Sequence, residues 1–379
     1  MYSNTNKTKA TIILSLVFSF VLVSLSESFT AKAEATLQEK GISILNNVLG
    51  LDLTKYTVTI NEIPAELQLP YFDVLPMKDI GYDLTSEESK VKTLFTFVDG
   101  NLQTIHVLET EGPPSLTTPA TSTNAAEMAE DFLRSYQIYT ADSLYGELKD
   151  TLVNLDASEN STETFGNMQL EVSAVDGYTT FKWTYTFNGV TAPSKVVALG
   201  FKNGFLNYFV DNWNLYRIGS TNISLSKDEA VAIALETARA YNWSMEMSAD
   251  TLDPENFNES NVRWTSLIFD DSVGAGKARS EDLLTLYPVW RVGIALDKWH
   301  GNMYGIEVDI WADTKEIRRI QEAWSTMPPP EGNSSTPPSG GDEPPIPEFP
   351  SWIILPLLIT ATLLILICKH KLPKKHQLA

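Results

Sequence analysis

The 379-residue sequence predicts an α+β fold of tandem units, each a helix packed on an antiparallel sheet, followed by a disordered stalk and one transmembrane helix. Three observations lead to this prediction. A capped helix followed by alternating strands occurs twice within residues 119–326. Residues 327–348 contain eight prolines. An apolar run without charges, 349–368, then precedes four lysines. The elements are taken below in chain order.

Residues 1–33 have the pattern of a secretory signal peptide. Lys7 and Lys9 precede an apolar run over residues 10–25, and Ala31-Lys32-Ala33 offers small residues at a cleavage site. We therefore expect the mature chain to begin near Glu34. An uncleaved signal anchor is the alternative.

Residues 34–118 are expected to form an N-terminal α+β unit. Apolar residues recur at helical spacing over 37–49, and Gly50 is placed to stop that helix. Strands are predicted over 56–60, 91–98 and 102–108. The last two flank Asp99-Gly100-Asn101, which favours a tight hairpin turn.

Residues 119–221 are expected to form the first of two similar units. Asn124 is placed to cap a helix that runs to about Tyr136. The following strand alternates aromatic and polar residues, and Asn188-Gly189 then favours a type I′ hairpin turn. We predict that the aromatic side of this strand faces the core, under its own helix. The four aromatic residues are Phe181, Trp183, Tyr185 and Phe187.

Residues 222–326 repeat the plan. Ser226 and Glu229 have the spacing of a capping box, so a helix is expected to begin at once after Ser226. Strands are predicted over 287–296, 304–311 and 316–322. The segment 242–281 is expected to be a long insert between the helix and its hairpin.

The second unit resembles a PepSY domain. The resemblance rests on the helix start at 226–234, on Tyr287-Pro288-Val289-Trp290-Arg291-Val292, and on the strand–turn–strand segment 305–317. It covers roughly residues 222–325, and residues 119–220 show it more weakly. Lys315 stands where the family often has glycine. The resemblance implies a helix on a small antiparallel sheet. It also implies a role beside secreted proteases or in the cell envelope.

The C-terminal segments predict a tethered surface protein. The proline-rich linker 327–348 favours an extended conformation. The 20 residues of 349–368 are long enough to span a bilayer, and the basic tail 369–379 should stay cytoplasmic. This is a single-pass type I topology with an extracellular ectodomain. Pro347-Glu348-Phe349-Pro350 and the segments after it also resemble the archaeal sorting signals known as PEF-CTERM, in which a transpeptidase would remove the helix.

Composition excludes several classes of function. The net charge of −20 opposes nucleic-acid binding. The only cysteine, Cys368, lies in the apolar segment, so the exterior part has neither disulfides nor a cysteine nucleophile. No zinc-protease motif, serine nucleophile elbow or phosphate loop occurs. We therefore expect no enzyme activity, no cofactor and no metal. A calcium-binding loop at Asp253, Glu255, Asn256, Asn258 and Glu259 is a weaker alternative to a solvated loop.

The sequence predicts a non-catalytic, membrane-anchored binding or regulatory protein with a protein partner at the cell surface. A structural spacer in a surface layer is the first alternative. A hydrolase that uses two of the many carboxylates is the second. Sequons for glycosylation occur in expected loops, helix ends and the stalk, as on an archaeal surface glycoprotein. The candidate sites are Asn160, Asn222, Asn242, Asn258 and Asn333.

Overall fold

The computed structural model describes residues 35–62, 75–117, 124–243, 257–273, 275, 279–300 and 302–325. The predicted signal peptide, proline-rich linker, transmembrane segment, basic tail and Asn333 lie outside these residues. Within the described ranges, no helix has both the length and the apolar character needed to cross a bilayer.

The described strands form one 14-stranded mixed sheet. Its main path runs β1-β2-β3-β4-β9-β8-β11-β12-β13-β14, and β7 extends it from β8 towards β6 and β5. The strands are β1 Thr57–Glu62, β2 Met77–Thr85, β3 Lys90–Val98, β4 Asn101–Glu111, β5 Ser161–Phe165, β6 Met168–Val175, β7 Tyr178–Phe187, β8 Val190–Lys202, β9 Phe205–Asp211, β10 Arg217–Ile218, β11 Val262–Asp270, β12 Thr285–His300, β13 Met303–Trp311 and β14 Ile317–Trp324.

The expected fold of tandem helix-plus-sheet units is therefore wrong. Strand β4 pairs with β9 through Ile105 and Phe209, which joins strands that the sequence assigned to separate units. Strand β8 bridges β11 in parallel at Thr191 and Ile268, and β10 pairs with β12 in parallel. Separate small sheets would leave unpaired edges, and these pairings satisfy the edge groups instead.

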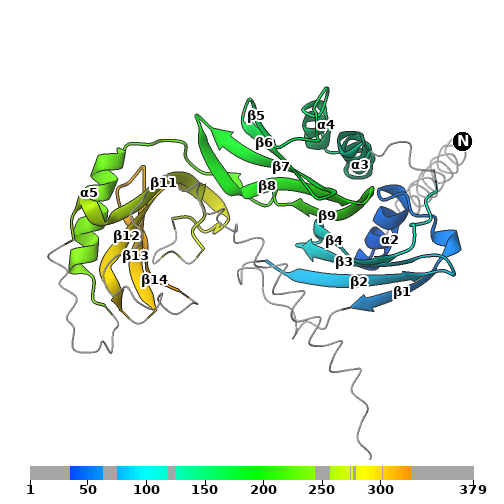
Figure 1. Cartoon of the computed structure of the whole chain (residues 1–379), viewed down its shortest axis with the longest axis horizontal. Coiled ribbons are helices and arrows are strands. Elements are labelled where there is room, and N and C mark those ends of the chain that lie inside the picture. The colour runs from blue at the N-terminus through cyan, green and yellow to red at the C-terminus, as the bar shows by residue number, and fades with distance from the viewer. Residues whose placement is uncertain are drawn as a thin grey trace, which may run out of the picture.

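Four α-helices accompany the sheet, α2 Leu37–Asn47, α3 Ala125–Thr140, α4 Leu144–Asp150 and α5 Lys227–Ala240. Two short 3₁₀ helices, η1 Leu53–Lys55 and η4 Glu259–Asn261, complete the set in the described ranges. The predicted capping box at Ser226 and Glu229 is confirmed, and the Asn124 side chain accepts a hydrogen bond from the backbone of Ala126. Figure 1 shows α5 beside β11–β14 at one end, and α2, α3 and α4 over the strands at the other.

The hairpin turns follow the predicted chemistry. Asp99-Gly100 and Asn188-Gly189 both adopt positive φ at each position, as type I′ turns require. Lys315 also has positive φ, 65°. That conformation explains why a glycine suits this position in the family that the segment resembles. The Lys315 ammonium contacts the Glu229 carboxylate at 2.9 Å, and both side chains are exposed.

Two of the four predicted core aromatics lie under the helices. Phe181 and Trp183 are fully buried and share a core with α3 residues such as Phe132. Tyr185 and Phe187 are half-buried and pack instead in a cluster around Phe269 of β11. The change of cluster coincides with an irregularity in β8, which has three extra residues opposite the step from Thr184 to Tyr185. Such an irregularity increases the local twist, and Tyr185 and Phe187 lie beyond it.

Candidate functional site

A network of acidic and basic side chains lies on the face of β11–β14 opposite α5. In β13, Ile306, Val308 and Ile310 pack in the core with α5, so the alternate residues Glu307 and Asp309 point to the other side. The same alternation in the neighbouring strands brings arginines to this face. Alternation therefore places Glu307 and Asp309 on this face of the sheet.

Charges of opposite sign stand opposite each other across three strands. Asp309 of β13 pairs in register with Arg291 of β12 on one side and with Arg319 of β14 on the other. Arg319 also contacts Glu307 at 3.2 Å. Directly opposed pairs of opposite charge stabilise a sheet, so this row holds β12, β13 and β14 in register.

A bulge in β14 supplies a second arginine. Asp309 pairs with Arg319 and Ile310 pairs with Ile317, so Arg318 is an extra residue in β14. A bulge re-aims a side chain that would otherwise point to the opposite face. Arg318 and Arg319 consequently both reach the Asp309 carboxylate, at 2.7 and 3.0 Å.

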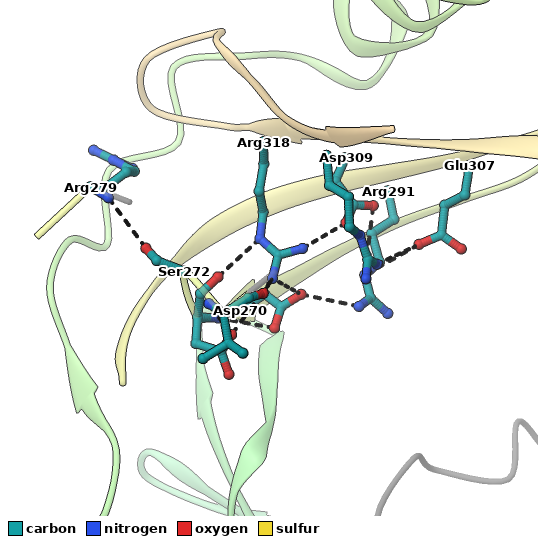
Figure 2. A network of polar contacts seen from close by, with 10 residues as sticks. Asp270, Ser272, Arg279, Arg291, Glu307, Asp309 and Arg318 are labelled. Atoms are coloured by element: carbon teal, nitrogen blue, oxygen red, sulfur yellow. Dashed lines mark hydrogen bonds and ion pairs between the residues drawn. The ribbon is translucent and has the colours of Figure 1, made fainter. Parts of the chain in front are cut away.

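Arg318 ties the loop after β11 to the sheet. Figure 2 shows its guanidinium between Asp309 and Asp270. Its Nε donates to the backbone carbonyl of Asp271 at 2.9 Å, and one terminal nitrogen donates to that of Val273 at 3.3 Å. Arg318 is only 3% exposed, so its ion pairs and hydrogen bonds are shielded from water. One buried side chain therefore holds the first part of this loop on the sheet.

The network holds one more acid than base. Three guanidinium groups meet four carboxylates, those of Asp270, Asp271, Glu307 and Asp309. Asp309 is fully buried, and its Oδ1 makes no hydrogen bond. The Nε of Arg291 lies 3.9 Å from this oxygen and makes no hydrogen bond either. An unsatisfied buried oxygen is unfavourable, so the Asp309 carboxylate depends on its ion pairs with Arg318 and Arg319.

The acid–base properties agree with that excess. Burial, then the neighbouring Asp270 carboxylate, raises the pKa of Asp271 to about 6. Burial and Asp309 likewise raise the pKa of Glu307. Burial by itself would lower the pKa of Arg291, but the surrounding carboxylates outweigh it and raise that pKa. The raised pKa values of the two acids favour their neutral forms, and the raised pKa of Arg291 keeps its guanidinium charged beside the carboxylates.

We expect Asp271→Asn to remove part of the pH dependence of stability. Because the folded pKa of Asp271 is raised to about 6, its contribution is present at low pH and lost as pH rises through that value. The amide keeps the acceptor for the Val273 backbone. Between pH 4 and pH 7 the wild type should lose about 2 kcal/mol of unfolding free energy more than the variant.

Urea unfolding at pH 4, 5.5 and 7 measures this difference. Asp150→Asn is the matched control, because Asp150 lies exposed at the end of α4. Parallel curves for Asp271→Asn and the wild type would show that Asp271 does not bind the proton.

A bidentate ion pair borders the network. Arg279 contacts both oxygens of Asp313, at 2.6 and 3.0 Å, and its guanidinium lies over the rings of Tyr287 and Trp311. Its backbone N–H donates to Ser272. This contact fixes the second end of the loop that Arg318 holds.

A second polar cluster joins β8 to the loop after β9. The Lys195 ammonium donates to the carbonyls of Trp213 and Tyr216, and burial lowers its pKa to about 8. The Tyr145 hydroxyl donates to Asp211, whose pKa burial raises to about 6. Each of these groups is already engaged in holding chain segments together.

The predicted sequons have exposed positions where they are described. Asn160, Asn222, Asn242 and Asn258 are all exposed. The oxygens of Asn160 and Asn258 accept bonds from Ala174 and Ser260, whereas a glycan attaches to the side-chain nitrogen. The calcium prediction cannot be placed in full, since residues 251–256 lie outside the described ranges. Among the described residues, no acidic or histidine group has the arrangement of a metal site.

Sequence reasoning did not identify the network. Arg291 and Asp309 stand in strands that were predicted, but nothing marked them as a site. Asp270 and Asp271 lie in the segment that was expected to be an insert. The available signal was the alternation of charge with apolar residues at Glu307-Val308-Asp309, together with the consecutive arginines Arg318 and Arg319 in a strand.

Comparison with known proteins does not assign this chain to a family. No protein-family model and no curated protein matches it. Among solved structures, it is similar to the Bacillus megaterium YpeB C-terminal domain, with 12% identity and a TM-score of 0.31. The match covers 76% of this chain and 98% of that one. A similarity at this level carries no argument about function.

Proposed function

We propose that the chain is a non-catalytic binding or regulatory protein, anchored in the cell membrane with residues 34–348 on the extracellular side. The observation that supports this proposal is that the carboxylates of the charged network on β11–β14 are already paired. Asp309, Glu307 and Asp270 each contact an arginine guanidinium. A catalytic acid or base must be free to reach a substrate, and these groups are occupied in holding strands and a loop.

The partner in this proposal is a protein of the cell surface, either a protease or another envelope component. The resemblance of residues 222–325 to PepSY domains favours a protease. The acidic character of the chain favours a partner with a basic surface.

Affinity capture tests the proposal. The tagged full chain is purified from gently solubilised envelopes of its own cells, and co-purifying proteins are identified by mass spectrometry. A second capture in high salt separates partners held by charge from others. Recovery of a protease or of one specific envelope protein supports the proposal. Recovery of surface-layer protein alone supports the spacer, and recovery of nothing specific contradicts binding.

The hydrolase alternative has its own test. Glu307 and Asp309 are neighbouring acids on one face of β13, so they form a carboxylate pair that this alternative would use. Hydrolysis of glycoside or peptide substrates that is abolished by Glu307→Gln in a folded variant would establish an enzyme and overturn the proposal.

The proposed topology predicts how a protease acts on cells. In wall-free cells, added protease should cut the proline-rich stalk and release a soluble fragment that ends within 330–348, because an extended, unpacked segment is readily cleaved. A chain truncated before Phe349 should appear in the medium. Retention of that truncated chain in the membrane fraction would mean that residues 10–25 remain as an anchor.

A further inference from the structure

The outer edge of β1 differs from the other long edges of the sheet. Within the described residues, β1, β5 and β14 lie at edges. Strand β14 carries Arg318, Arg319 and Glu322 and has two register shifts against β13, and β5 has Glu163 at its centre. Charges and bulges of this kind protect an edge from pairing with another strand.

Strand β1 has no such protection along residues 57–61. Its sequence Thr57-Val58-Thr59-Ile60-Asn61 has no charge and no proline, and it pairs with β2 without a register shift. Five of the six β1 residues are exposed, and Ile60 keeps 42% of its surface in contact with solvent. The outer backbone groups of β1 have no strand partner among the described residues. An unprotected edge of this length is a template for a further strand.

The pattern of β1 is complementary to itself. Two identical strands pair antiparallel in one sheet about a two-fold axis perpendicular to that sheet, so both faces are preserved. Directly opposed residues then share a face. Centred on Thr59, this pairing sets Val58 against Ile60, apolar against apolar, on the side where Val58 contacts the core under α2. On the other side it sets Thr57 against Asn61 and Thr59 against itself.

The neighbouring register is less favourable. Centred on Ile60, it sets Val58 against Glu62, which places a carboxylate opposite an apolar residue. Residues Gln38 and Lys78 already contact Glu62 from its own chain. Glu62 therefore remains at the rim in the first register and becomes part of the contact in the second.

We propose that β1 is a homodimer interface, at which a second copy of this chain adds its own β1 antiparallel and centred on Thr59. The contact continues the sheet from one copy into the other and covers Ile60 of both. An interface of one short strand pair is small, so the dimer is weak and depends on concentration. Attachment of both copies to one membrane, which rests on the proposed function, raises their effective concentration.

Mass measurement across a concentration series tests the interface. The purified full chain, in mild detergent, is studied by light scattering and sedimentation at concentrations up to about 100 µM, where an interface of this small size becomes populated. We expect a monomer–dimer equilibrium. Thr59→Lys places two ammonium groups opposite each other at the axis and should weaken the dimer by about fivefold. Thr164→Lys, an exposed threonine on the β5 edge, is the matched control and should have no effect.

Hydrogen exchange provides a readout that does not depend on a variant. Amide protection that increases with protein concentration only in residues 57–62 supports the proposal. A wild type that stays monomeric throughout, a dimer that survives Thr59→Lys, or protection that increases elsewhere instead would each overturn it.

Discussion

Replacement of Trp183 by alanine is expected to lower the free energy of unfolding by about 3–5 kcal/mol. Trp183 is fully buried in the core between the sheet and α3. Its ring stacks with that of Phe181, with 6.1 Å between the ring centroids. Its Nε1 also donates to the Thr151 hydroxyl at 2.8 Å, and this hydroxyl in turn donates to the carbonyl of Leu148. The variant therefore leaves a large cavity and removes one buried hydrogen bond.

Chemical unfolding monitored by circular dichroism measures this loss. Trp183→Phe separates the two contributions, because it removes the hydrogen bond and retains most of the apolar volume. Trp324→Ala is the control, since Trp324 is 54% exposed and should change stability by less than about 0.5 kcal/mol. A Trp183→Ala variant as stable as the wild type would contradict the core assignment.

Replacement of Arg318 by methionine is expected to have an effect of similar size, about 3–5 kcal/mol, because it removes the closest and most buried of the arginines that neutralise a buried carboxylate. Asp309 is fully buried and would lose its shortest ion pair, at 2.7 Å. The carbonyls of Asp271 and Val273 would lose their donors as well. Methionine retains much of the apolar stem, so the loss reports on charge and hydrogen bonding and not on volume.

The neighbouring arginine provides the control. Arg319→Met removes the same charge from a side chain that is 29% exposed, where solvent screens the loss, and should have a clearly smaller effect. Limited proteolysis should also show earlier cleavage near residues 271–279 in Arg318→Met than in Arg319→Met. Equal unfolding free energies for the two variants would mean that the network is hydrated and that Arg318 has no special part in holding the loop.

The local elements were predictable because their signals are local. The capping box at Ser226, the turn at Asn188-Gly189 and the strand containing Trp183 each depend on residues within a few positions of one another. Strands β2, β5, β6, β10 and β11 were missed. Strand β11 lies in the segment that was expected to be an insert.

The site could not be predicted because its parts come together only through strand pairing. Asp270 and Arg318 are distant in sequence and lie 3.2 Å apart. The bulge that turns Arg318 towards Asp309 depends on the register between β13 and β14. Sequence alternation placed Glu307 and Asp309 on one face, but it did not reveal which charges would stand opposite them.

By itself, the sequence determined the helix starts, the tight turns and the burial of Phe181 and Trp183, because capping, backbone conformation and alternation act over short distances. It also supplies the composition on which the proposed surface location rests. The tertiary structure alone decided that one sheet replaces separate units, through the β4–β9 and β8–β11 pairings. The backbone hydrogen bonds that join two edges can be made by any residue except proline, so the local pattern of one strand did not identify β9 as the partner of β4 or β11 as the partner of β8.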